Sequence, residues 1–135
     1  MKTNLKNILG MAALGMTLLT GTVPTWAGWV FTPGVTIGSN QLGSFGKGSM
    51  VGARYSADNK QYIYCIAIAS TNPTDYSTTC GAADSTGNHL VCGSRDPKLQ
   101  DRLQGITDSS FISFTVDSSG NCTDIRIYQG SEQMK

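Results

Sequence analysis

His89 is the side chain best suited to proton transfer in this sequence, because an unperturbed imidazole titrates near neutral pH. It is the only histidine in the chain, which excludes any site that needs two. Beside a carboxylate and Arg95 or Arg126, the imidazole could accept a 2′-hydroxyl proton while the guanidinium holds a phosphate. Since His89 follows a predicted turn, where histidines are commonly exposed, this hydrolase or nuclease chemistry is the alternative to a binding function.

A second group of side chains suits binding rather than catalysis. Trp29, Tyr55 and Tyr76 lie outside the apolar run at residues 61–70. Aromatic rings offer contact area at a small cost in conformational entropy. We therefore predict that these three residues contribute to a surface that binds a protein or a glycan. Tyr62 and Tyr64 have apolar neighbours and are predicted to lie in the core instead.

Charge and turn composition narrow the range of ligands. The 10 Lys and Arg are balanced by 9 Asp and Glu, whereas binding to nucleic-acid phosphates needs a large excess of positive charge. We therefore expect no nucleic-acid partner. Two turns of the form D-S-[ST]-G-N, at residues 84–88 and 117–121, hold one carboxylate each. That is too few for a calcium site, so no metal or cofactor is expected.

Residues 1–27 have the pattern of a secretory signal. Lys2 and Lys6 precede an uncharged apolar run at residues 8–19, and Thr25 and Ala27 place small side chains before a cleavage site. The run is about a dozen residues long, and a span across a bilayer needs roughly 20. The mature chain is therefore predicted to begin at residue 28, to be secreted or periplasmic, and to keep no membrane span.

The four cysteines, Cys65, Cys80, Cys92 and Cys122, all lie in the predicted mature chain. An even number in a short exported chain indicates two disulfides, and the closely spaced C-x2-C pairs typical of zinc sites do not occur. A three-residue turn with Gly87 in the left-handed region would set Cys80 opposite Cys92. We therefore predict the bonds Cys80–Cys92 and Cys65–Cys122, and two other connectivities stay open.

Apolar alternation and turn residues predict five strands and one helix in the body of the chain. The helix covers residues 96–105, with Asp96 as its cap and Pro97 in its first turn. The strands cover residues 61–70, 76–84, 88–94, 110–117 and 122–129. This is the element order of an OB-type barrel. We predict a small, mainly β, antiparallel barrel stabilised by disulfides, with a β-sandwich carrying one short helix as the alternative.

Three regions surround or modify this body. The glycine-rich segment 28–48 is predicted to be an irregular arm with short strand pieces, before a β domain at 49–129 and a polar tail at 130–135. Residues 50–56 are interpreted as a further strand. Both faces of strand 61–70 are apolar, so it is predicted to be central and covered on both sides. In strand 122–129, Cys122, Asp124 and Arg126 would share one face unless a bulge intervenes.

The run Gly52-Ala-Arg-Tyr-Ser-Ala-Asp58, followed by Gln61-Tyr-Ile-Tyr-Cys65, resembles a pattern in small secreted bacterial proteins of uncharacterised function. The cysteine spacing and the helix start Ser94-Arg-Asp-Pro97 are part of the same resemblance, which covers residues 49–129. The resemblance implies a secreted protein with two disulfides and assigns no site or activity. Because no catalytic constellation emerges and the loops suit recognition, we predict an exported, non-catalytic binding domain.

Overall fold

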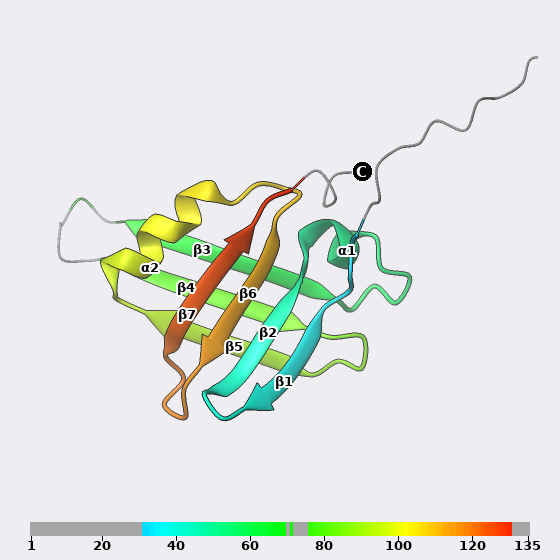
Figure 1. The fold of residues 1–135 in the computed structure, drawn as a ribbon, viewed down its shortest axis with the longest axis horizontal. Coiled ribbons are helices and arrows are strands. Elements are labelled where there is room, and N and C mark those ends of the chain that lie inside the picture. The colour runs from blue at the N-terminus through cyan, green and yellow to red at the C-terminus, as the bar shows by residue number, and fades with distance from the viewer. Residues whose placement is uncertain (1–30, 70, 72–75, 131–135) are drawn as a thin grey trace, which may run out of the picture.

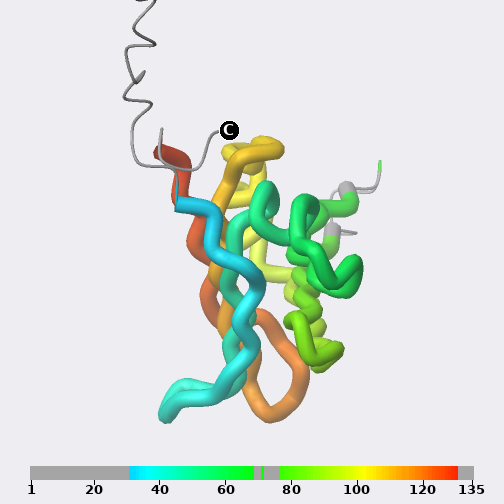
Figure 2. Tube along the Cα trace, turned by 90° about the vertical axis from the view of Figure 1, so that its right-hand side faces the viewer, coloured from blue at the N-terminus to red at the C-terminus, as the bar shows by residue number. Residues whose placement is uncertain are grey.

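The computed structural model describes residues 31–69, 71 and 76–130, and for Ala69 and Tyr76 it describes the backbone alone. The predicted signal at residues 1–27, Trp29 and the tail beyond residue 130 lie outside the described residues. In the described part, two antiparallel sheets pack face to face, and their strands cross (Figure 1). Figure 2 shows the two sheets edge-on as separate layers.

Seven strands and three short helices make up the described fold. Sheet A has the order β1-β2-β6-β7 and sheet B the order β3-β4-β5. The strands of sheet A are β1 (Thr36–Asn40), β2 (Gly43–Ser49), β6 (Phe111–Val116) and β7 (Cys122–Tyr128). Those of sheet B are β3 (Tyr62–Ala69), β4 (Tyr76–Ala83) and β5 (His89–Ser94). The helices are α1 (Met50–Arg54), α2 (Pro97–Arg102) and the 3-10 turn η1 (Leu103–Gly105).

The predicted barrel is wrong and the sandwich alternative is confirmed, because the five predicted strands belong to two separate sheets. The glycine-rich segment supplies the two extra strands, β1 and β2, which pair with each other and with β6. Glycine suits this segment because ring and backbone atoms occupy the space that a larger side chain would need. A Cβ at Gly46 would lie 2.7 Å from the Phe114 ring, so β2 and the core approach closely at this point.

The core lies between the sheets and is closed at one end by the predicted helix. Phe114, Ile112 and Ile125 of sheet A are fully buried against Ile63 and Ala82 of sheet B. Leu99 and Leu103 complete the cluster from α2 and η1. The helix prediction is confirmed, since the Asp96 carboxylate accepts a hydrogen bond from the backbone N–H of Lys98 at 2.9 Å.

The strand predicted at residues 50–56 is wrong, because α1 occupies most of this segment. The Ser49 Oγ accepts a hydrogen bond from the backbone N–H of Gly52 at 3.2 Å and so caps the helix. Val51 and Ala53 are the buried residues of this helix. The five-residue helix is too short for a clear apolar period, and its start depends on a single serine.

The prediction that strand 61–70 is central is also wrong. In the described fold β3 is an edge strand of sheet B, and only its inward face is covered. Ile63 and Cys65 point inward, whereas Tyr62, Ile66 and Ile68 are exposed. Tyr62 is therefore not a core residue. An apolar strand face indicates a surface that is covered by other apolar groups, and these can come from the same chain or from a partner.

The two D-S-[ST]-G-N segments form hairpin turns with the same geometry, as predicted. Asp84 N–H donates to the Asn88 carbonyl at 3.1 Å, and Asp117 N–H donates to the Asn121 carbonyl at 3.0 Å. Gly87 and Gly120 have φ values of 91° and 82°, the left-handed region that glycine enters at low cost. In the last strand, where the sequence left open whether a bulge intervenes, the register shifts between Thr115 and Val116, so a bulge is present.

The predicted disulfide pairs are wrong. Cys65 is bonded to Cys80, and Cys92 is bonded to Cys122. The predicted register itself is correct, since Cys80 lies opposite both Cys65 and Cys92. Opposite residues in an antiparallel hairpin alternate between hydrogen-bonded and non-hydrogen-bonded pairs. Asp84 and Asn88 are a hydrogen-bonded pair, so Cys80 and Cys92, four residues further along each strand, are one too. The side chains of hydrogen-bonded pairs lie farther apart.

On the other side of β4, toward β3, the side chains of the paired cysteines lie closer together. Cys65 and Cys80 form a non-hydrogen-bonded pair with a Cα–Cα distance of 4.0 Å, which brings their side chains together. Cys92 instead meets Cys122, because the β6–β7 turn touches β5 through a hydrogen bond from Gly93 N–H to the Gly120 carbonyl at 3.2 Å. One disulfide therefore joins two strands within sheet B, and the other joins the two sheets.

Candidate functional site

The outer face of sheet B carries a group of exposed apolar side chains, which we call the apolar face. Tyr62 is 38% exposed, Ile66 47%, Ile68 56% and Val91 52%. The strand register places all four on the side of the sheet that points away from the core, together with the half-buried Tyr64. Scattered exposed apolar residues are ordinary, but a contiguous group on one face marks a contact surface.

Small residues of the central strand let the large side chains lie flat. Tyr64, Gly81 and Val91 form one row across the sheet. A Cβ at Gly81 would lie 2.7 Å from the Tyr64 ring, so this ring covers the glycine. The rings of Tyr62 and Tyr64 are stacked with their centroids 5.9 Å apart. The result is an aromatic surface supported by backbone, which costs little entropy to immobilise on binding.

No Asp, Glu, Lys or Arg lies in the register rows that make up this face in the described strands. The next rows pair Tyr62 with Ala83 and His89, and Ile66 with Thr79 and Gly93. An uncharged face of this kind suits an uncharged partner surface, because burying an unpaired charge against it would be costly.

His89 is held by the apolar face rather than by a catalytic neighbour. Its Nδ1 lies 3.0 Å from the Tyr62 hydroxyl, and the two ring centroids are 5.8 Å apart. The pair crosses the sheet above Ala83, which is completely buried beneath it. The imidazole therefore acts in the described structure as part of the aromatic row.

The other predicted catalytic residues are not brought to His89. His89 begins β5, whereas Arg95 follows the far end of that strand and lines a depression of about 440 Å³ with Thr79 and Asn121. Arg126 lies on β7 in the other sheet. The proposed combination of one imidazole, one guanidinium and one carboxylate is therefore not assembled around His89 in the described residues.

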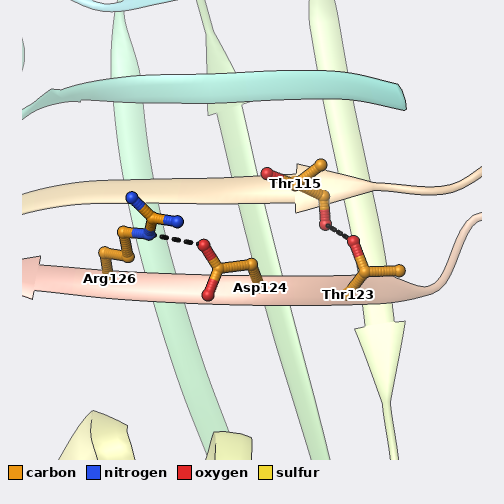
Figure 3. Close-up of polar contacts among 4 residues, drawn as sticks. All are labelled: Thr115, Thr123, Asp124 and Arg126. Carbon is orange, nitrogen blue, oxygen red and sulfur yellow. Dashed lines mark hydrogen bonds and ion pairs between the residues drawn. The ribbon is translucent and has the colours of Figure 1, made fainter. Parts of the chain in front are cut away.

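Arg126 instead lies on the outer face of sheet A, in a shallow groove of about 630 Å³ that we call the polar groove. Its Nε donates to the Asp124 carboxylate at 2.6 Å (Figure 3). This hydrogen bond, followed by one with Tyr128, raises the pKa of Arg126. The lining also includes apolar and hydroxyl side chains: Asn40, Leu42, Phe45, Lys47, Ser113, Thr115 and Thr123.

The contacts within the polar groove are those of an ordinary solvated sheet face. Thr123 Oγ1 donates weakly to the Thr115 carbonyl at 3.4 Å (Figure 3), and the Lys47 ammonium lies 5.4 Å from the centre of the Phe45 ring. Arg126 is 62% exposed in its ion pair. Exposed pairs of this kind stabilise little, so the groove has the polarity expected of an outward-facing sheet.

The predicted aromatic binding residues are only partly described. Tyr55 is 65% exposed just after α1 and lines a depression of about 580 Å³ with Arg54 and Asp108. Trp29 and the side chain of Tyr76 lie outside the described residues. The binding role of these three residues stays a prediction. The aliphatic members of the apolar face, Ile66, Ile68 and Val91, were missed because an apolar run is read first as core.

The motif that carries the family resemblance has a structural role in this chain. Asp58 accepts hydrogen bonds from the backbone N–H of Lys60 at 2.8 Å and from Gln61 Nε2 at 2.6 Å, and these bonds lower the pKa of its carboxyl. Gln61 Oε1 in turn accepts from the N–H of Val35 at 2.6 Å. The network ties the start of β3 to the segment that leads into β1, and therefore sets where sheet B begins.

In comparisons with known proteins, no family model, curated protein or solved structure matches this chain. Within the described residues, no three His, Cys, Asp or Glu side chains come together in a way that could hold a metal ion. Nor does any helix in the described ranges have the length and apolar character needed to cross a membrane.

Proposed function

We propose that this protein is an exported, non-catalytic recognition domain whose apolar face binds another protein at the cell envelope or outside the cell. The observation that supports this proposal is the exposure of Tyr62, Ile66, Ile68 and Val91 on one uncharged sheet face. Leaving such a surface in water forgoes roughly 25 cal/mol per Å² of apolar area that a partner could bury. Two disulfides in a small sandwich suit a rigid scaffold for an oxidising compartment.

The composition of the face favours a protein over a glycan. Aliphatic side chains such as Ile66, Ile68 and Val91 offer no hydrogen bonds to sugar hydroxyls, whereas a protein partner can cover them with apolar groups of its own. The tyrosines add aromatic contact area with a polar tip, the combination found at protein interfaces. The hydrolase alternative has less support, because His89 meets neither Arg95 nor Arg126 in a common pocket.

A capture experiment with matched variants tests the proposal. The oxidised protein is immobilised and exposed to envelope and culture-medium fractions of its own source, as wild type, Val91→Asp and Leu42→Asp. Leu42 is 78% exposed but lies on the turn between β1 and β2, away from the apolar face. We expect a saturable protein partner for wild type and Leu42→Asp, and at least about a tenfold loss of affinity for Val91→Asp, which corresponds to 1.4 kcal/mol.

The control separates recognition from general stickiness. Both variants add one carboxylate in place of one exposed aliphatic side chain, so a loss caused by charge alone would affect them equally. Equal capture by all three proteins, or capture of no partner by any of them, would refute the proposed function. Circular dichroism of each variant checks that the fold is intact.

A further inference from the structure

The two sheets have four edge strands, and three of them are protected against pairing with another chain. β1 is only five residues long. β7 carries a bulge and two charged residues, Asp124 and Arg126. β5 is occupied at Gly93, whose N–H donates to the Gly120 carbonyl at 3.2 Å. Short strands, charges, bulges and covering loops are the means by which proteins prevent edge-to-edge association.

In the described residues, the fourth edge strand, β3, is not short and carries neither a charge nor a bulge, although α1 and η1 pack near it. It is eight residues long, contains no charged residue and no proline, and pairs with β4 through eight consecutive residues without a register shift. Long, regular, apolar edge strands are the ones that pair with a strand of another chain. β7 carries a bulge and charged residues, and β3 carries neither, so the two edges differ in their protection against pairing.

The hydrogen-bond alternation shows which groups the free edge offers. Because Cys65 and Cys80 form a non-hydrogen-bonded pair, Cys65 directs its backbone N–H and carbonyl away from β4. Ile63 and Ala67 do the same by alternation. Within the described part of the chain, no backbone group is hydrogen-bonded to those of Ile63, Cys65 or Ala67. The edge therefore presents a regular row of donors and acceptors.

The second half of this edge is the accessible part. Ile63 and Cys65 are buried, and α1 and η1 pack near β3. Ile66, Ala67 and Ile68 are all exposed, although Ala67 faces the opposite side of the sheet from the two isoleucines. Three consecutive exposed residues in a strand mean that, among the described residues, both faces of this stretch are open to solvent and to another strand.

We propose that this edge pairs antiparallel with the same edge of a second copy of the chain, around a two-fold axis at Ala67. Each Ala67 N–H would then donate to the carbonyl of the partner's Ala67, and Ile66 would lie opposite the partner's Ile68. The two sheets B would join into one six-stranded sheet with a continuous apolar face. This pairing uses the edge of sheet B, whereas the protein partner proposed above binds its outer face.

A second copy is favoured as the occupant because the edge is complementary to itself. A two-fold axis requires the same patch on both subunits, and a residue with both edge groups free at the centre of the exposed stretch meets this requirement. Neither β3 nor its neighbouring rows carries a charge that doubling would bring into repulsion. Pairs of β-branched residues opposite each other, such as Ile66 and Ile68, add to the stability of antiparallel pairing.

Sedimentation velocity of the oxidised, exported protein over a concentration series tests the proposal, with Ala67→Pro and Ala67→Ser as the matched pair. Proline removes the central edge N–H without removing a β3–β4 hydrogen bond and is tolerated on strand edges. Serine keeps the N–H. We expect a dimer for wild type and Ala67→Ser, and a dissociation constant raised at least about tenfold for Ala67→Pro. Slow hydrogen exchange at the Ala67 amide in the dimer would identify the edge itself.

A wild type that stays monomeric at every concentration would overturn the proposal, as would an Ala67→Pro protein that dimerises as tightly as Ala67→Ser. If Ala67→Pro fails to fold, Ile68→Lys takes its place, and dimerisation of that variant as tight as wild type overturns the edge mode. Val91→Asp separates the two proposals, because Val91 lies on β5, at the far side of the sheet. It is expected to lose the protein partner and keep the dimer.

Discussion

The outward faces of the two sheets differ in kind, although both are built from short antiparallel strands. On sheet A, Lys47, Asp124 and Arg126 stand among hydroxyl side chains in the polar groove. On sheet B, tyrosines and aliphatic residues form rows that contain no charged residue, and Arg95 lies beyond the end of β5. A sandwich needs only its inner faces to be apolar, so the charges of sheet A are the expected pattern. The apolar outer face of sheet B departs from this pattern and therefore indicates a surface for a partner.

The largest expected effect is the loss of stability when a side chain on the inner side of sheet A is truncated, compared with one on its outer side. Phe114 is 1% exposed and fills the space above Gly46, so Phe114→Ala should lower the free energy of unfolding by about 3–5 kcal/mol. Phe45→Ala, on the outer side of the same sheet, should cost clearly less because Phe45 is only half-buried. Urea denaturation of both variants measures the difference. Equal losses would mean that the outer face of sheet A is packed like a core.

The next effect distinguishes the bond within sheet B from the bond between the sheets. Replacing both Cys65 and Cys80 by Ala removes a disulfide with a sequence separation of 15, and replacing Cys92 and Cys122 removes one of 30. We expect losses of about 3 kcal/mol, with about 0.6 kcal/mol more for the longer loop. Guanidinium denaturation of the two double variants checks the order. A larger loss for the pair within sheet B would show that the sheet, rather than the loop, is what the disulfide stabilises.

These differences also show which parts of the fold could be predicted from sequence. The hairpins at Asp84–Asn88 and Asp117–Asn121 and the helix after Asp96 were predictable, because their signals are hydrogen bonds within a few residues. The disulfide pairing was predicted wrongly, although counting from the hydrogen-bonded pair Asp84–Asn88 already makes Cys80–Cys92 the more widely spaced kind of pair. The position of Cys122 depends on how sheet A lies on sheet B, which no local pattern records.

The candidate site was missed for a related reason. The apolar run from Tyr62 to Ile68 is plain in the sequence, and burial on both sides is its simplest interpretation. Exposure of one side depends on how many elements remain to cover it. The glycine-rich segment was predicted to be an arm but formed β1 and β2 in the other sheet. The inner face of sheet B is therefore covered, and Ile66 and Ile68 remain exposed.

A smaller effect compares the turns at the ends of the two sheets under acid. Hydrogen bonds from the side chains of Thr86 and Asn88 lower the pKa of Asp84 to about 2, and those from Asn121 lower the pKa of Asp117. A carboxyl whose pKa is depressed in the folded state stabilises the fold above its unfolded pKa, near 3.9. That stabilisation should fade as the pH falls from about 4 to 2.

Denaturation midpoints at pH 5 and pH 2 measure this dependence in wild type, Asp84→Asn and Asp117→Asn. Asp84→Asn should flatten it more, because in the sheet B turn the Thr86 hydroxyl also donates to Asp84, at 2.7 Å. If Asp117→Asn has the larger effect, the turn of sheet A contributes more than its hydrogen bonds indicate.

The smallest expected effect is in the polar groove. Asp124→Asn removes the partner of Arg126, yet Arg126 is 62% exposed and keeps its charge at any physiological pH. Water replaces an exposed partner at little cost, and salt screens what remains. We therefore expect no measurable change in Tm, at low or high salt, in scanning calorimetry. A clear loss of stability would mean that the groove holds its charges in a fixed arrangement, as a binding site does. The polar groove would then replace the apolar face as the first surface on which to look for a ligand.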